Sequence, residues 1–352
     1  MNSNLEKVGV VYHRDYLIHT HSQHPERKER LEAIWKVLEQ ESFKDLVELI
    51  EPESAKVEDI TLVHHENHVE AVKEACREDR GFLDMDTYIV PESYQVALLS
   101  AGGALKGLQQ IMKGNIKKVF SLGRPPGHHA EKSRSMGFCL FNNIAIAAET
   151  ARKKYGLNRI AIVDWDVHHG NGTQNSLYEE DEILFISIHQ NPAYPGTGHL
   201  DEIGSSRGKG YNINIPLSPG TGNGDFVKVF SEVVLPVLEE YRPQLVMISA
   251  GQDSHARDPL AGMNLTDGGY YYMASSLKEV ADKYADGRML LTLEGGYHLE
   301  AQASAVGQVI KALSQKDSVA EGMDYSISGN MTLNNLEILK NYLGDYWKAL
   351  QQ

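Results

Sequence analysis

Short runs of apolar residues alternate along the chain with longer segments whose apolar residues recur every three or four positions. The short runs predict strands buried on both faces, and the longer spacing predicts amphipathic helices. Because the two alternate, we predict an α/β fold with helices on both faces of a parallel sheet. Strands are expected at 7–12, 47–50, 117–122, 160–163, 183–189, 245–250 and 289–294, with an edge strand at 212–216.

Helices are expected between these strands. Pro25 suits the first turn of a helix that runs to about Glu39. The segment 190–211 is rich in glycine and proline, and a loop of that length is usually functional or mobile. No repeat or linker is visible, so we expect one domain over residues 1–352, although the length alone also permits two. Further helices are expected at 64–76, from 91 onward, and at 143–154, 173–178, 225–241, 266–284, 299–313 and 333–349.

Composition narrows the classes of function. The formal net charge of −14 argues against general affinity for nucleic acid and favours a cationic substrate. Only Cys76 and Cys139 are present, which suits a reducing compartment rather than a disulfide framework. The first nine residues have no apolar signal-peptide core, and no apolar run is long enough to span a bilayer. We therefore expect a cytoplasmic protein with no membrane partner.

The stretch 159–172 contains the strongest chemical signal. The apolar run 160–163 is followed by Asp164, Asp166 and His168, which point to one side if the chain is extended. Two carboxylates and an imidazole at the end of a buried strand are costly to hold without a cation. The stretch therefore predicts a metal site, and the alternative is a turn that caps the next helix.

Three other predicted strands are also followed by loops with unusual polar residues. These residues are His128 and His129 in the first loop, Asp253 in the second and Tyr297 in the third. Such loops meet at one edge of a parallel sheet. Taken singly, each fragment is more often a helix cap or a packed loop residue. Taken together, they predict a metal hydrolase. No Gly-x-Ser-x-Gly elbow or P-loop is present to support a serine hydrolase or a nucleotide-binding protein.

Each member of this set has a chemical role. Asp166, His168 and Asp253 would bind a metal and leave positions open for water and substrate, as in catalytic zinc sites. The metal would polarise an amide carbonyl and acidify a water molecule. His128 and His129 would serve as general base and general acid. Tyr297 would donate a hydrogen bond to the carbonyl oxygen, and Asp164 would orient a histidine.

These residues resemble the zinc-dependent histone deacetylase superfamily over roughly residues 10–313. The resemblance implies an arginase-like three-layer α/β/α domain and a class II-like lysine deacylase or amidohydrolase. The matching segments are His24-Pro-Glu-Arg27, Arg124-Pro-Pro-Gly-His-His129, Gly137-Phe-Cys139, Asn142-Asn143, Asp164-Trp-Asp-Val-His-His-Gly-Asn-Gly172, Tyr194-Pro-Gly-Thr-Gly198, Ala250-Gly-Gln-Asp-Ser254 and Leu293-Glu-Gly-Gly-Tyr297.

The resemblance implies that zinc binds Asp166, His168 and Asp253, that His129 is the main acid–base residue, and that Asp164 orients His128. It also implies a structural potassium ion beside the zinc, held partly through backbone carbonyls. The matching potassium positions are Asp164, Asp166, His168, Ser187 and Ile188.

The resemblance further implies how a substrate is bound. Phe138, next to Gly137, and Tyr194 match the aromatic walls of an acyl-lysine tunnel, and an apolar slot suits a lysine stem. Asp86 falls near a rim aspartate that grips the substrate backbone. Leu260 stands where polyamine deacetylases carry a glutamate, which favours acyl-lysine over a substrate with a second buried cation.

The chain departs from the family pattern at three positions. Asn171 stands where some relatives carry a second histidine-orienting aspartate, and Asn is the choice in the class II-like branch. Gln252 replaces the commoner Phe or Tyr before the third metal ligand. His298 follows Tyr297 in a run that resembles the polyamine deacetylases.

Several alternatives stay open beside a lysine deacylase that acts on proteins or peptides. The acidic surface and His298 favour an acetylpolyamine or other small-amide amidohydrolase. A binding module without activity and an arginase-type dinuclear manganese hydrolase have less support, because the mononuclear catalytic set is complete. The ligand set suits Zn²⁺ and also admits Fe²⁺. The family includes monomers, dimers and tetramers, so no oligomeric state is predicted.

Overall fold

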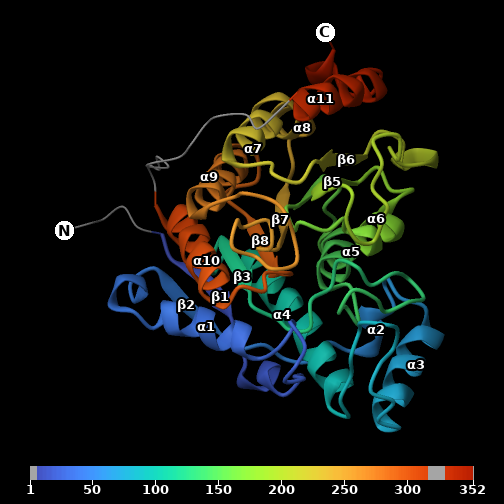
Figure 1. The fold of residues 1–352 in the computed structure, drawn as a ribbon, viewed down its shortest axis with the longest axis vertical. Coiled ribbons are helices and arrows are strands. Elements are labelled where there is room, and N and C mark those ends of the chain that lie inside the picture. Colours follow the sequence, from blue (N-terminus) through green and yellow to red (C-terminus); the bar gives the residue numbers. More distant parts are fainter. Residues whose placement is uncertain (1–5, 316–329, 352) are drawn as a thin grey trace.

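The computed structural model describes residues 6–315 and 330–351, and its centre is one parallel sheet (Figure 1). The strands are β1 Val8–Val11, β2 Val47–Ile50, β3 Lys118–Ser121, β4 Ile160–Asp164, β5 Ile183–Gln190, β6 Asn212–Leu217, β7 Leu245–Ala250 and β8 Met289–Leu293. Their order in the sheet is β2-β1-β3-β8-β7-β4-β5-β6, and each neighbouring pair runs parallel. The predicted parallel sheet is confirmed, with β6 at one edge.

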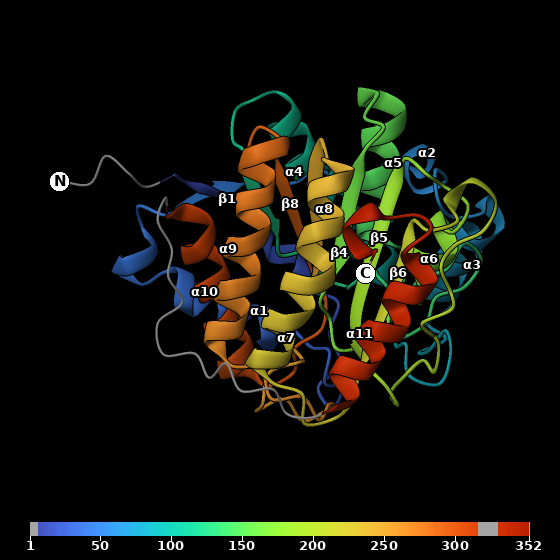
Figure 2. The same ribbon diagram turned by 90° about the horizontal axis from the view of Figure 1, so that it is seen from above.

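Helices cover both faces of this sheet, and α7 to α11 line one of them (Figure 2). The helices are α1 Glu29–Leu38, α2 Val57–Ile60, α3 Glu66–Arg77, α4 Ser93–Met112, α5 Asn143–Tyr155, α6 Asn171–Leu177, α7 Asn223–Val229, α8 Leu235–Tyr241, α9 Asp267–Tyr284, α10 Leu299–Ser314 and α11 Asn330–Leu343. Ile160 and Ile162 pack in the core layer of α4 and α5, whereas Ala161 and Val163 pack in the opposite layer. Burial on both faces explains the continuous apolar runs of the strands.

Three predicted helices differ from the observed ones in where they begin, where they end or whether they are continuous. The first helix begins at Glu29, because residues 25–28 bend to bring the Glu26 side chain into the core. The last helix ends at Leu343, and a separate 3₁₀ turn follows at Lys348–Leu350. The helix expected at 225–241 is interrupted by a π-helical turn, Phe230–Val234, between α7 and α8.

The prediction of one domain over 1–352 includes residues 1–5, 316–329 and 352, which lie outside the described residues, and it stays a prediction. In the part of the chain that the structure describes, every helix is too short or too polar to cross a lipid bilayer.

Four neighbouring strands, β3, β8, β7 and β4, end at the same edge of the sheet. Their register pairs Ser121 with Thr292, Thr292 with Ser249, and Ser249 with Asp164. The loops that follow these strands carry the four polar segments singled out in the sequence. The sheet therefore brings distant parts of the chain to one place.

Candidate metal centre and active site

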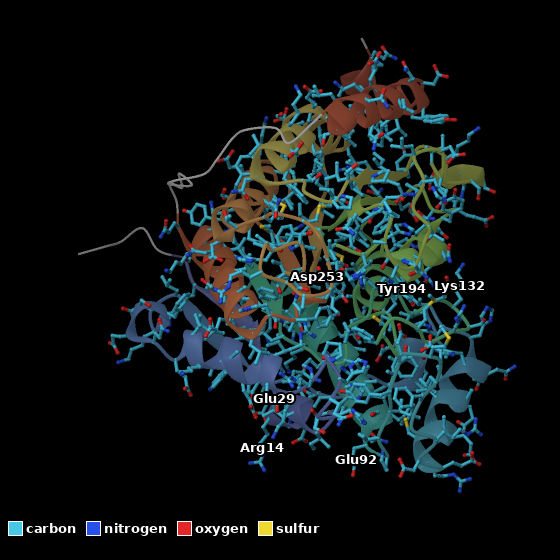
Figure 3. All side chains as sticks on the ribbon, in the orientation of Figure 1. Arg14, Glu29, Glu92, Lys132, Tyr194 and Asp253 are labelled. Atoms are coloured by element: carbon cyan, nitrogen blue, oxygen red, sulfur yellow. The ribbon has the colours of Figure 1, made fainter. Side chains whose placement is uncertain are left out.

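Asp166, His168 and Asp253 converge at this edge of the sheet. Each residue has one potential ligand atom, a carboxylate oxygen or an imidazole nitrogen, that lies within 4.8 Å of those of the other two. Nδ1 of His168 lies 3.2 Å from Oδ1 of Asp166 and 3.2 Å from Oδ2 of Asp253. Both carboxylates are fully buried, and His168 is only partly exposed. Figure 3 shows Asp253 near the centre of the molecule, in the loop after β7.

Backbone groups hold the two carboxylates in place. Oδ2 of Asp166 accepts a hydrogen bond from the Gly295 N–H at 2.7 Å, and Oδ1 of Asp253 accepts one from the Val167 N–H at 2.8 Å. A Cβ atom at Gly295 would lie 2.0 Å from Oδ2 of Asp253, and one at Gly251 would lie 2.1 Å from Oδ2 of Asp166. These close approaches require glycine, and they leave one oxygen of each carboxylate facing the imidazole.

This donor set fits a divalent metal ion. Two carboxylate oxygens and an imidazole nitrogen are ligands that Zn²⁺ and Fe²⁺ accept. Burial acts to lower the pKa of His168, but hydrogen bonds to Asp166 and Asp253 outweigh it and raise the pKa to about 10. A divalent cation would displace that proton, because metal ligands must be deprotonated.

The histidine pair lies beside these residues, and its ring centroids are 3.9 Å apart. Nδ1 of His128 lies 3.0 Å from Oδ2 of Asp164, and Nδ1 of His129 lies 2.8 Å from Oδ1 of Asn171. Nε2 of His128 lies 3.8 Å from Oδ1 of Asp166. Each ring is therefore oriented through Nδ1, one by a carboxylate and the other by an amide.

The pKa values of the two histidines move in opposite directions. Burial alone would lower the pKa of His128, but the carboxylates of Asp166 and Asp164 outweigh it and raise that pKa to about 10. The pKa of His129 lies well below its usual value, because burial and the charges of His128 and His168 act in the same direction. A bound cation would offset part of the negative charge that acts on His128. His129 is thus the member of the pair that is held neutral.

Tyr297 lies in the loop after β8 and packs between two other side chains. Its ring is 4.9 Å from the guanidinium carbon of Arg30, and its centroid is 5.7 Å from that of the perpendicular Phe138 ring. Oδ2 of Asp258 accepts hydrogen bonds from the backbone N–H groups of Tyr297 at 2.6 Å and His298 at 3.3 Å. Burial raises the pKa of the Tyr297 hydroxyl well above its usual value, so this hydroxyl keeps its proton and can donate it in a hydrogen bond.

Aromatic and glycine residues from separate loops border the histidines. The Tyr194 ring centroid lies 5.1 Å from that of His129 and 6.3 Å from that of His168, and the side chain is labelled in Figure 3. Gly137 packs directly on His129, since a Cβ atom there would lie 2.4 Å from Cδ2 of the imidazole. An aromatic ring therefore borders both the histidine pair and the candidate metal ligand His168.

Asp86 and Leu260 connect to the site through other residues. Asp86 is linked to the Phe138 loop through Thr87, whose hydroxyl donates to Oδ1 of Asp86 at 3.3 Å. The Leu260 side chain is exposed, and its backbone N–H donates to Oδ1 of Asp258 at 3.0 Å. The structure thus joins Leu260 to the site through Asp258 and leaves its side chain at the surface.

The residues predicted to bind potassium lie on neighbouring strands. The sheet register pairs Asp164 on β4 with Ser187 on β5, and both are fully buried together with Ile188. Oδ1 of Asp164 accepts a hydrogen bond from the Asp166 N–H at 3.1 Å, and Oγ of Ser187 lies 2.9 Å from Nδ1 of His189. The potassium assignment stays a prediction.

Glu294 supports the histidine loop and had no predicted role. Its Oε2 accepts hydrogen bonds from the backbone N–H groups of Gly127 at 2.7 Å and His128 at 3.1 Å. Its Oε1 accepts one from the Thr292 hydroxyl at 3.0 Å. The only signal in the sequence was its place in the segment that ends at Tyr297.

A buried charge cluster behind Tyr297 was also missed. The carboxylate of Glu26 pairs with Arg124 through two contacts and with Arg30 at 3.1 Å, and all three side chains are fully buried. Arg30 donates in turn to the carbonyl of Gly296 at 2.7 Å, which fixes the loop before Tyr297. Glu26 and Arg124 stand in two of the matching segments, but spacing does not show that they pair.

Comparison with known proteins identifies the family to which this site belongs. Residues 24–313 match the histone deacetylase domain. The chain belongs to the histone deacetylase family. This match covers most of the span over which the sequence resembles the family.

Relatives in this family align over most of the chain. A probable deacetylase of Archaeoglobus fulgidus is 38% identical over 358 residues, covering 97% of this chain and 99% of that protein. The histone deacetylase-like amidohydrolase of Pseudomonas aeruginosa is 40% identical over 278 residues, covering 79% and 72%. The crystal structure of the HDA15 HD domain matches with a TM-score of 0.90 and 35% identity, covering 98% of this chain and 96% of that one. The predicted deacetylase fold is confirmed.

Proposed function

We propose that this histone deacetylase family protein is a metal-dependent amidohydrolase that removes acetyl or other short acyl groups from the lysine side chains of proteins or peptides. The observation that carries the proposal is the convergence of Asp166, His168 and Asp253 beside the histidine pair. A zinc ion, or ferrous iron, bound there would polarise the amide carbonyl and acidify water. We further propose that the protein acts in the cytoplasm and that potassium is bound, partly through backbone carbonyls, by Asp164, Asp166, His168, Ser187 and Ile188.

The protein's own residues would move the protons. His129, which is held neutral, accepts a proton from water as the water oxygen bonds to the carbonyl carbon. Tyr297 donates a hydrogen bond to the carbonyl oxygen as charge grows there. His129 then passes the proton to the lysine nitrogen while the C–N bond breaks, which gives a free amine and a carboxylic acid. His128, held by Asp164, stays beside it as an electrostatic partner.

Substrate recognition would use the borders of the site. Phe138 and Tyr194 suit the apolar stem of an acylated lysine. Asp86 at the rim can accept hydrogen bonds from a peptide backbone. Leu260 offers no charge for a second cation, whereas the net charge of −14 favours cationic molecules in general. The second candidate, an acetylpolyamine amidohydrolase, rests on that charge.

A metal-reconstitution experiment tests the proposal. Protein treated with a chelator is reloaded with Zn²⁺ or Fe²⁺ and assayed on an acetyl-lysine peptide, acetylspermidine and acetylputrescine. We expect activity to return with metal and kcat/KM to be highest for the peptide. Loss of one hydrogen-bond donor to a developing oxyanion costs about 10²–10³ in rate, so Tyr297→Phe should lower kcat by that amount.

Two results would reject this assignment. Metal-loaded protein that hydrolyses acetylpolyamines but not peptides would favour the second candidate. Full activity of Tyr297→Phe would remove the assigned role of that hydroxyl.

A further inference from the structure

The aromatic wall residue Phe138 sits in an unusual backbone conformation. Met136 and Cys139 exchange backbone hydrogen bonds of 3.2 and 3.0 Å, so that Gly137 and Phe138 form the centre of a two-residue turn. Both have positive φ, at 56° and 69°. Glycine adopts this region freely, whereas an aromatic residue rarely does, because its Cβ crowds the backbone. Its surroundings must therefore hold Phe138 there.

A single hydroxyl from another loop supplies a contact that holds it. The Phe138 N–H donates to Oγ1 of Thr87 at 3.1 Å, across 51 residues of sequence. The same hydroxyl donates to Oδ1 of Asp86 at 3.3 Å. Thr87 is fully buried. One buried hydroxyl thus accepts a hydrogen bond from the wall and donates one to the rim carboxylate.

Thr87 is itself held firmly. Its backbone N–H donates to Oδ1 of Asp84 at 2.8 Å, and its carbonyl accepts a hydrogen bond from Leu83 at 2.9 Å. The His24 ring packs perpendicular to the Phe138 ring at 4.5 Å, and its Nε2 lies 3.0 Å from the Asp86 carbonyl oxygen. The segment 84–87 and Phe138 therefore pack together, and the Thr87 hydroxyl joins them.

We propose that Thr87 is a positioning residue that sets the width of the acyl-lysine slot, because it holds Phe138 in the left-handed conformation and aims Asp86. Thr87 acts through these two side chains and touches no reacting atom. The inference rests on the proposed function, since it concerns the walls of the same site.

Two substitutions separate the hydroxyl from the space it fills. Thr87→Val keeps the shape but removes the Thr87 acceptor of the Phe138 N–H, and Thr87→Ser keeps the hydroxyl. We expect Thr87→Val to lower kcat/KM for an acetyl-lysine peptide about tenfold, mainly through KM, because the Phe138 N–H loses its hydrogen-bond partner. If Phe138 is no longer held in place, the ratio of kcat/KM for a butyryl-lysine peptide to kcat/KM for an acetyl-lysine peptide should also rise several-fold. Thr87→Ser should stay near wild type in both readouts.

Thr150→Val is the matched control. Thr150 lies in α5, and its hydroxyl donates to the Ile146 carbonyl at 2.8 Å within the helix. Its replacement removes a buried hydroxyl away from the slot and should leave both KM and the acyl ratio unchanged. If Thr87→Val does not fold, Thr87→Ala against Thr87→Ser repeats the comparison with two smaller side chains.

The outcomes are distinct. Wild-type KM and acyl ratio in Thr87→Val, or equal impairment of Thr87→Ser, would overturn the inference while the proposed function stands. A wild-type protein that is inactive on both acyl-lysine peptides would overturn the proposed function and this inference together.

Discussion

Asn171 serves two neighbours with opposite requirements. Its Oδ1 lies 2.8 Å from Nδ1 of His129, and its Nδ2 donates to Oε1 of Glu131 at 2.7 Å. An aspartate could still accept a hydrogen bond from His129, but it would place a second carboxylate against Glu131. The neighbouring glutamate therefore gives a physical reason for the amide at this buried position.

Asn171→Asp should lower kcat/KM for an acetyl-lysine peptide by roughly tenfold, because repulsion from Glu131 displaces the residue that orients His129. The double variant Asn171→Asp/Glu131→Gln should recover most of that loss, since the new amide can donate to the aspartate. Steady-state kinetics of both variants and of Glu131→Gln alone measure the coupling. An equal loss in the single and double variants would contradict this account.

The convergence of the candidate metal and acid–base residues could be predicted, because each follows an apolar run that ends at the same edge of the sheet. The supporting contacts could not be predicted. Glu294 meets Gly127 across 167 residues, and Thr87 meets Phe138 across 51. These are contacts between a side chain and a distant backbone N–H, which leave no periodic pattern in the sequence. Similarly, nothing in the sequence showed that the Leu260 side chain would be exposed.

At the scale of elements, the segment before α1 is shaped by one buried carboxylate. Burial acts to raise the pKa of Glu26, but Arg124 and Arg30 outweigh it and lower that pKa to about 2. The Tyr88 hydroxyl donates to Oε2 of Glu26 at 3.1 Å. Glu26 thereby ties α1 to the loop after β3 and to the segment before α4. This requirement overrides the helix start that Pro25 suggests.

Glu26→Ala should lower the free energy of unfolding by about 3–5 kcal/mol, because it leaves two buried guanidinium groups without their carboxylate. Urea denaturation at pH 7 measures the change. Glu41→Ala is the control, since Glu41 forms an exposed pair with Lys44 at 3.4 Å and such pairs contribute little. Similar losses in the two variants would show that the buried cluster does not stabilise the fold.

The strands could be predicted closely, whereas several helix ends could not. A strand buried on both faces produces a continuous apolar run, as in β4 and β7. Helix ends depend on local contacts instead. The predicted helix 333–349 joins α11 to a separate 3₁₀ turn, Lys348–Leu350, although apolar residues continue through both.

At the scale of the whole molecule, the sheet separates two apolar core layers and gathers buried polar groups at one edge. His64 lies in the segment between α2 and α3 and contacts the loop that follows β3. Nδ1 of His64 donates to the Glu131 carbonyl at 2.9 Å, and its Nε2 accepts a hydrogen bond from the Asn142 N–H at 2.8 Å. The segment that carries Phe138 is thus fixed at both ends by one neutral imidazole.

Protonation of His64 is incompatible with this arrangement, because a proton on Nε2 would face the Asn142 N–H. Burial, with a smaller contribution from His68, lowers the pKa of His64 to about 3 in the folded protein. The unfolded chain binds the proton near pH 6.5, so it carries more protons than the folded protein below that pH. Stability from His64 is therefore complete above about pH 6.5 and falls as the pH decreases towards 3.

This difference predicts that His64 contributes about 2 kcal/mol to the loss of unfolding free energy between pH 7 and pH 5. Urea denaturation at both pH values measures the loss for the wild type and for His64→Leu. The variant should be less stable at pH 7 but should lose about 2 kcal/mol less on acidification. His199→Ala, which removes an exposed imidazole instead, is the control. Equal acid losses in wild type and His64→Leu would mean that the imidazole becomes protonated in the folded protein without breaking its contacts to the segment 131–142.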